Sequence, residues 1–268
     1  MKEILDFLAG LFEEGLSYRY ISLVRSAISA YHTPIEGINV GRHHLICRLM
    51  TGMGIQTPPQ PRYCVIWDVE KVLDYLRRLP EDKDLPLDLL THKTAMLLAL
   101  AAVSRGSELW LLDINLMADT ENMILFYFQK APKNFKKLGA VPKPLEIHAS
   151  HMHLCPVKTS LEYRSRTASL RGDVTQFFVR TIRPHVGVTR STIGRWLKEV
   201  LKKTGVDTTA FAGHSTRAAS TSKAHARGAS VDDILKRGGW SNFSTWQKFY
   251  NKNIETPSLR FQEKLFNQ

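Results

Sequence analysis

The sequence predicts a mainly α-helical protein with a small antiparallel β-sheet, an α+β fold. Apolar residues recur at helical spacing along most of the chain, and three short β-rich segments interrupt them, at residues 111–114, 123–128 and 145–147. Hydrophobic residues make up 43% of the 268 positions, which is enough for a packed core. No apolar run reaches the roughly 18 residues of a membrane span, so none is predicted.

Residues 1–56 are predicted to form a small, partial helical module. Its helices are expected over residues 3–14, from the capping Ser17 onward, and over about 41–51. Three short helices make a thin core, which is typical of a module that lacks helices at its N-terminus. Closely spaced prolines then predict an extended linker at 57–66, because proline lacks a backbone donor and biases the residue before it away from helix.

Residues 67–268 are predicted to form a larger second domain. Its helices are expected over residues 67–78, over 91–103, from Ile193 to Leu201, and from the capping Ser230 to Gly238 and Gly239. The three β-rich segments lie between the second and the third of these helices.

Positive charge is concentrated in the middle of the chain. There are 37 Lys and Arg against 25 Asp and Glu, a formal net charge of +12. Residues 127–203 contain 16 basic and four acidic residues, which equals the whole excess, whereas residues 1–60 sum to zero. This pattern indicates a surface that meets a polyanion, with DNA as the first candidate and a solvated basic face as the alternative.

Three cysteines, Cys47, Cys64 and Cys155, are far apart and odd in number. This usage is typical of reduced thiols in an intracellular protein, and we interpret all three as small buried apolar residues. None lies in a paired metal-ligand spacing, so no metal site is predicted. The N-terminus lacks the basic start and apolar centre of a signal peptide.

Two basic elements in the middle of the chain are candidates for phosphate binding. Arg105 follows an apolar helix directly, at a position where an arginine is more often simply exposed. The loop between the last two β-rich segments contains four lysines: Lys130, Lys133, Lys136 and Lys137. The alternative for this loop is a solvated hairpin tip.

Two further elements lie near the C-terminus. In a helix, His214 and Arg217 would be one turn apart and project in similar directions. Arginine offers a bidentate fork to non-bridging phosphate oxygens, and histidine offers a donor or a proton relay. The alternative is a capping histidine beside an exposed arginine. Trp240 and Tyr250 follow, and each alone is more often a core aromatic than a catalytic group.

The order of these elements resembles the signature of the tyrosine recombinase and phage integrase family. That signature is an arginine, a hairpin lysine, His-x-x-Arg, a tryptophan and then a tyrosine. The segments that carry the resemblance are 98–109, 213–219, 239–240 and 248–250. Within the family, the chain is most similar to recombinases of eukaryotic mobile elements, in the retrotransposon and Crypton-like groups. Residues 1–56 resemble the later helices of the family's core-binding (SAM-like) domain, and 67–268 resemble its catalytic domain.

The resemblance implies a reaction and a role for each residue. Tyr250 would attack the scissile phosphodiester as the nucleophile, forming a 3′-phosphotyrosyl link and freeing a 5′ hydroxyl. Arg105 and Arg217 would bind the non-bridging oxygens, and a loop lysine would protonate the leaving 5′ oxygen. His214 would assist proton transfer or orientation. Trp240 stands where many relatives have histidine, and it can donate one N–H to the phosphate but cannot shuttle a proton.

The lysine and the tyrosine are each chosen among neighbours. Lys133 is assigned as the general acid because the residue after it is small and polar, as in the family, with Lys136 as the second choice. The commoner family interval after the tryptophan puts Phe249 at the place of the tyrosine, whereas the mobile-element branch uses the longer interval that ends at Tyr250. Two other tyrosines lie far upstream of the second box: Tyr127 and Tyr163.

The expected partner is double-stranded DNA, with phosphate contacts from the helical module and from the loop. The residues assigned to DNA binding are Arg25, Lys130, Lys136 and Lys137. The alternative for Arg25 is an arginine that is simply exposed on its helix. The resemblance also implies a homotetramer on DNA and, in a eukaryotic host, a nuclear location. It implies no metal or other cofactor, because the phosphotyrosine conserves the bond energy for rejoining. Glu108 is expected either as a buried partner that orients nearby groups or as a capping or surface carboxylate.

Two other functions are open at this stage. One is a decayed or domesticated recombinase domain that binds DNA or protein without cutting, although all expected catalytic residue types are retained. The other is a type IB topoisomerase-like enzyme, which shares the phosphotyrosine chemistry but matches the Gly-Trp-Ser segment at 239–241 less well. Phe261 and Leu265, one helical turn apart, are expected in a C-terminal helix that docks on a neighbouring protomer or on its own domain.

Overall fold

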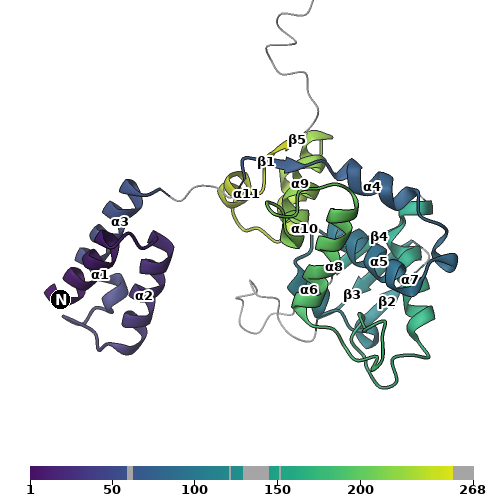
Figure 1. Cartoon of the computed structure of the whole chain (residues 1–268), viewed down its shortest axis with the longest axis horizontal. Coiled ribbons are helices and arrows are strands. Elements are labelled where there is room, and N and C mark those ends of the chain that lie inside the picture. The colour runs from purple at the N-terminus through teal and green to yellow at the C-terminus, as the bar shows by residue number, and fades with distance from the viewer. Residues whose placement is uncertain (59–62, 121, 129–144, 151, 256–268) are drawn as a thin grey trace, which may run out of the picture. The chain divides into compact units, whose positions relative to one another are not determined.

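A computed structural model describes residues 1–58, 63–120, 122–128, 145–150 and 152–255 (Figure 1). These residues are mainly helical with a small antiparallel sheet, which confirms the predicted fold class. Their contacts divide the chain into an N-terminal unit, residues 1–62, and a C-terminal unit, residues 63–268. Over the described ranges, no helix is both long enough and apolar enough to cross a membrane.

The N-terminal unit packs three helices around a small apolar core. The helices are α1 (Lys2–Glu13), α2 (Tyr18–Tyr31) and α3 (His44–Gln56), with a short 3₁₀ helix at Val40–Arg42. Leu8, Ile21 and Ile46, one from each helix, are fully buried. The Ser17 hydroxyl accepts the N–H of Tyr20, so the predicted N-cap of α2 is confirmed.

The predicted end of α3 near residue 51 is wrong, because the helix continues to Gln56. Met50 and Met53 are both buried on its inner face, and this packing extends the helix. A glycine inside a helix costs only about 1 kcal/mol relative to alanine, so the glycine at position 52 does not end it.

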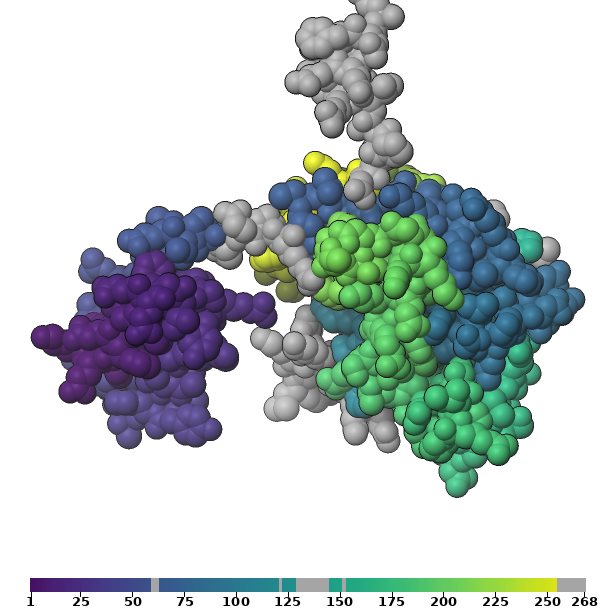
Figure 2. All heavy atoms as spheres, in the orientation of Figure 1, coloured from purple at the N-terminus to yellow at the C-terminus, as the bar shows by residue number. Residues whose placement is uncertain are grey.

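One helix forms the centre of the C-terminal unit. It is α5 (Leu87–Ala101), and it packs against α7 (Pro156–Thr167), α8 (Arg190–Lys203) and α9 (Thr216–Ala226). Most of its residues from Leu90 to Leu100 are buried, as expected of a strongly apolar helix at the centre of a unit. In the space-filling view, atoms from the early (blue) and late (green) parts of this unit form one continuous surface (Figure 2).

The antiparallel sheet has the order β2-β3-β4. Its strands are β2 (Met117–Asp119), β3 (Met123–Phe126) and β4 (Leu145–His148). Ile124 faces Ile147 across the last two strands, and both are buried. The strand predicted at 111–114 is wrong: α6 (Gly106–Trp110) occupies the preceding residues and a turn follows. Leu109 and Leu112 are buried one helical turn apart, which is helical rather than strand spacing.

The described part of the C-terminal unit has two further strands, three further α-helices and four 3₁₀ helices. They are β1 (Val65–Trp67), α4 (Val69–Arg77), α10 (Val231–Gly238), α11 (Phe243–Phe249) and β5 (Asn253–Glu255), with 3₁₀ helices at Asp82–Asp84, Ile114–Leu116, Met152–Leu154 and Gly213–Ser215. β1 and β5 pair in parallel, although β1 begins inside the range predicted as linker. The Ser230 hydroxyl accepts the N–H of Asp233 and caps α10 as predicted. Gly239 ends α10 in the left-handed region, at φ 64°.

The cysteines differ in exposure. Cys155 is buried, as predicted, whereas Cys47 and Cys64 are exposed and the prediction is wrong for both. Cys47 lies on the outer side of α3, where its thiol donates to the carbonyl of Gly41 at 3.8 Å. Cys64 lies just before β1, where the chain enters the unit.

A buried ion pair ties α5 to the segment before it. The ammonium of Lys93 is 2.7 Å from a carboxylate oxygen of Asp82, and the Lys93 side chain is 1% exposed. The other oxygen of Asp82 accepts the hydroxyl of Thr159 on α7, at 2.6 Å. Asp82 therefore compensates a charge that has no access to water.

We predict that the two halves of this ion pair are unequal. Asp82→Asn leaves the Lys93 ammonium buried without a counter-charge, so it should lower the free energy of unfolding by about 3 kcal/mol. Lys93→Met should cost about 1 kcal/mol, since Asp82 keeps its bond to Thr159. Urea denaturation followed by circular dichroism measures both. Glu81→Gln, which removes an exposed ion pair with Lys83, is the control. Equal losses from the two buried substitutions would contradict the prediction.

Candidate active site

Two arginines that are far apart in the sequence share one carboxylate. Arg105 is the N-cap of α6, and Glu108 lies in the first turn of that helix. One oxygen of Glu108 accepts the backbone N–H of Arg105 at 2.7 Å, and the other pairs with the Arg105 guanidinium at 2.5 Å. Arg217, at the start of α9, has its Nη1 atom 3.6 Å from the same carboxylate. Glu108 is therefore both a capping residue and the ion-pair partner that orients the two guanidiniums.

Arg217 is the more deeply placed of the two arginines. Its side chain is 4% exposed, against 22% for Arg105. Burial, followed by the nearby charge of Arg105, lowers the pKa of Arg217 to about 10, so the guanidinium is still charged at neutral pH. Its Nη1 donates to the carbonyl of Val103, and its Nη2 donates to the carbonyl of Gly238 at 2.6 Å. These partners compensate a charge that would otherwise be costly to bury.

The backbone that supplies these carbonyls has an unusual conformation. Val103 has a φ of 52°, in the left-handed region that costs a non-glycine residue roughly 1–3 kcal/mol. Gly238 packs against the ring of Trp240 so closely that a methyl group on its Cα would overlap the indole. Any side chain at position 238 would therefore displace the indole from this place.

Two aromatic rings cover the Arg217 guanidinium. The guanidinium carbon is 4.6 Å from the ring centroid of Trp240 and 5.7 Å from that of Tyr250. The two rings are themselves 4.6 Å apart, at an interplanar angle of 53°. The phenol of Tyr250 and the pair of arginines thus form one cluster.

Helix α11 brings Tyr250 to this cluster. Trp246, near the middle of α11, is fully buried and packs edge-on against His225 of α9, with ring centroids 5.2 Å apart. Tyr250 follows the helix directly, and its N–H donates to the carbonyl of Trp246 at 2.8 Å. Phe249 is 57% exposed, so of the two neighbouring positions only Tyr250 meets the arginines.

His214 lies in the 3₁₀ helix that leads into α9, three residues before Arg217. It is exposed, whereas Arg217 is buried, so the two side chains differ in environment.

The upstream alternatives to Tyr250 lie outside the cluster. Tyr163 is fully buried, its pKa is raised to about 12 by that burial, and its hydroxyl accepts the N–H of Val179. Tyr127 is 44% exposed, after β3.

Several predicted residues lie elsewhere. Lys130, Lys133, Lys136 and Lys137 lie outside the described residues, as do Phe261 and Leu265. In the described residues on either side of the four lysines, Phe126 pairs with Leu145 across β3 and β4.

Arg25 belongs to the N-terminal unit. It lines a polar cavity of about 220 Å³ together with Ser26, Ser29, Asn39, Gly41 and Arg42. Its Nε atom is buried and has no hydrogen-bond partner among the described residues.

Sequence reasoning missed two contributors to the cluster, the carbonyl of Val103 and the glycine at 238. The paired glycines at 238 and 239 were visible in the sequence, but only as a helix end. No side-chain pattern marks a carbonyl, so Val103 left no signal. In the part of the chain that the structure describes, no group of three or more His, Cys, Asp or Glu residues is placed to hold a metal ion.

The comparisons with known proteins identify the family. Residues 69–256 match the profile of the phage integrase family, and the chain therefore belongs to this family of tyrosine recombinases. No curated protein matches the sequence at a significant level.

Solved structures share the fold. The chain is 17% identical to XerA recombinase, covering 98% of this chain and 91% of that one, with a TM-score of 0.51. It is 15% identical to the Tn1549 transposon integrase in complex with transposon right end DNA, covering 100% and 85%, with a TM-score of 0.60. It is 16% identical to a lambda integrase tetramer bound to a Holliday junction, covering 97% and 67%, with a TM-score of 0.53.

We predict that Glu108→Gln destabilises the protein although it keeps an oxygen to cap α6. The amide cannot compensate two guanidiniums, so the free energy of unfolding should fall by about 1.5–3 kcal/mol, measured by urea denaturation. Glu199→Gln is the matched control, because Glu199 is a half-exposed carboxylate that also lies near a basic side chain, Arg195. That control should change stability by less than about 0.5 kcal/mol. A Glu108 variant as stable as the control would show that the shared carboxylate is dispensable.

Proposed function

We propose that the protein breaks and rejoins DNA strands at specific sites through a 3′-phosphotyrosyl intermediate on Tyr250. One observation carries the proposal. In a chain of the tyrosine recombinase family, Arg105 and Arg217 share the carboxylate of Glu108. The rings of Trp240 and Tyr250 cover the Arg217 guanidinium. Two cations beside a tyrosine hydroxyl match the needs of a phosphodiester under attack.

The proposed step transfers a phosphoryl group from DNA to the protein. The Tyr250 hydroxyl gives up its proton, through His214 or to water, as its oxygen bonds to phosphorus, and the bond from phosphorus to the 5′ oxygen breaks. Arg105 and Arg217 bind the non-bridging oxygens, where negative charge grows in the transition state. Lys133 gives a proton to the leaving 5′ oxygen, and attack by a 5′ hydroxyl reverses the sequence. The number of phosphoester bonds is unchanged, so rejoining needs no external energy source.

The remaining residues have supporting roles in the proposal. Trp240 donates its indole N–H to the phosphate, and His214 orients it or assists proton transfer. Because Arg217 lies beneath the rings of Trp240 and Tyr250, a phosphate that reaches it requires these rings to shift. Catalytic contacts often tighten only when substrate binds, so this arrangement is compatible with the proposed step.

Double-stranded DNA is the proposed partner. The net charge of +12 supports it, as do the complexes of the Tn1549 integrase with transposon DNA and of lambda integrase with a Holliday junction. We assign phosphate contacts to Arg25, Lys130, Lys136 and Lys137. The lambda integrase tetramer likewise supports a homotetramer on DNA. An origin in a eukaryotic mobile element, with a nuclear location, belongs to the same proposal.

The decisive experiment traps the covalent intermediate. The protein is incubated with a labelled pool of nicked duplexes with randomised cores. In these duplexes, cleavage releases a short strand that carries the 5′ hydroxyl, so the strands cannot be rejoined. We expect a protein–DNA adduct on a denaturing gel, its complete loss in Tyr250→Phe, and its retention in Tyr127→Phe. An adduct that persists in Tyr250→Phe would eliminate this nucleophile. Bound DNA without any adduct would support the non-cutting alternative.

A second experiment tests the general acid. Lys133→Ala should lower the rate of adduct formation by about 10²–10⁴-fold, the usual contribution of general acid catalysis. Replacing the leaving 5′ oxygen by sulfur should restore most of the rate, because a thiolate leaves without a proton. Lys136→Ala is the control and should behave as wild type at saturating DNA. If Lys136→Ala is the slow variant and the sulfur-containing substrate restores its rate, the general acid is Lys136 instead.

A further inference from the structure

We propose that Ser222 is a positioning residue that holds the backbone of the nucleophile Tyr250 in register with Arg217. The inference rests on the proposed function, because it concerns the geometry of that reaction. Ser222 lies on α9, five residues after Arg217, and is 3% exposed. Its hydroxyl donates to the carbonyl of Tyr250 at 2.9 Å and accepts the N–H of Lys252 at 2.9 Å.

These bonds replace those that a continuing helix would make. Helix α11 ends at Phe249, and Tyr250 leaves the helical conformation at φ −122° and ψ −29°. The last carbonyls of a helix have no partner within it, and the chain beyond is free to take other paths. Ser222 satisfies one carbonyl and one N–H on either side of the turn at 251. It thereby selects the path on which the Tyr250 ring lies over Arg217.

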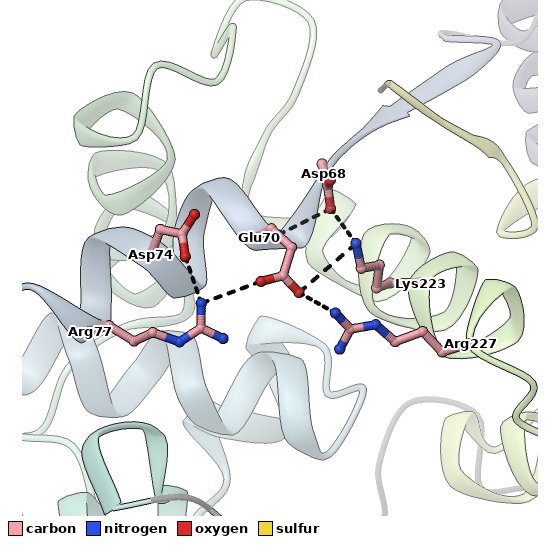
Figure 3. Close-up of polar contacts among 6 residues, drawn as sticks. All are labelled: Asp68, Glu70, Asp74, Arg77, Lys223 and Arg227. Carbon is pink, nitrogen blue, oxygen red and sulfur yellow. Dashed lines mark hydrogen bonds and ion pairs between the residues drawn. The ribbon is translucent and has the colours of Figure 1, made fainter. Parts of the chain in front are cut away.

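Ion pairs also hold the C-terminal part of helix α9 (Figure 3). Lys223 lies 3.0 Å from the carboxylate of Asp68 and 3.9 Å from that of Glu70. Arg227 lies 2.7 Å from Glu70. Burial alone would raise the pKa of Asp68, but the Glu70 N–H and Lys223 together lower it, so the carboxylate is charged. The cluster holds α9 against the start of α4.

The same start of α4 also holds the chain beyond Tyr250. Asp68 follows β1 directly, and β1 pairs with β5, whose first residue Asn253 lies opposite Val65. The indole of Trp67 donates to the Ser215 hydroxyl at 2.9 Å, next to the first turn of α9. The turn at 250–252 therefore lies between α11 and β5. Strand β5 pairs with β1, and α9 forms ion pairs with the start of α4, which follows β1. Ser222 is the side chain that connects α9 to the backbone of the proposed nucleophile.

The expected effect is on rate rather than on DNA affinity. A misplacement of about 1 Å at a reacting group can cost on the order of 10²-fold in rate. We therefore expect Ser222→Ala to slow adduct formation at saturating DNA by about 10–100-fold, with the dissociation constant for DNA unchanged. Ser220→Ala is the matched control. Ser220 is on the same helix and its hydroxyl donates to the carbonyl of Leu100 at 2.7 Å, away from the turn.

Hydrogen–deuterium exchange of the full chain gives a readout that does not depend on activity. The amide of Lys252 should exchange faster in Ser222→Ala than in wild type. Its exchange rate should be unchanged in Ser220→Ala. Equal rates of adduct formation in the two serine variants, or unaltered exchange at Lys252, would overturn the inference. If the wild type forms no adduct, the proposed function and the catalytic role of Ser222 both fail, while the exchange result still decides whether Ser222 anchors the turn.

Discussion

The burial of one positive charge organises the candidate active site of this protein. The Arg217 guanidinium is almost fully enclosed, so its donors need acceptors within the fold. Its two Nη atoms donate to the carbonyls of Val103 and Gly238, and the carboxylate of Glu108 supplies a counter-charge. These belong to the turn after α5, the end of α10 and the start of α6. A single side chain therefore draws three separate elements together, and the left-handed backbone at Val103 is tolerated because its carbonyl has this partner.

Helix α9 links this charge to the rest of the unit. Its first turn contributes Arg217, its middle contributes Ser222 against the backbone of Tyr250, and its end contributes Lys223 to the cluster on α4. The inner face of the helix is small, with Ala218 and Ala219 buried, which allows close approach to α5. The residue proposed to bind phosphate and the residue proposed to position the nucleophile thus lie on one helix. Rigid support of this kind is what transition-state positioning requires.

The elements that the sequence predicted well are those whose side chains repeat with a clear period. α8 shows its apolar face through Ile193, Leu197 and Val200, and α10 shows its cap through Ser230. Prediction failed where the apolar segment was too short to show a clear period, or where tertiary packing outweighed a local signal. The apolar run around Leu112 looked extended but belongs to a helical turn, and buried methionines carried α3 past its glycine at 52.

The sequence by itself determined the family, the fold class and the residue types of the candidate site, because widely separated motifs occurred in a recognisable order. It left open whether Glu108 was a cap or an orienting partner, and it could not reveal the roles of the Val103 carbonyl, Gly238 or Ser222. Only the tertiary structure decided these. A carbonyl carries no residue-specific signal, and a serine that bonds a backbone 28 residues away looks like any other serine in a helix. Such contacts depend on where the chain goes in space, which local periodicity does not encode.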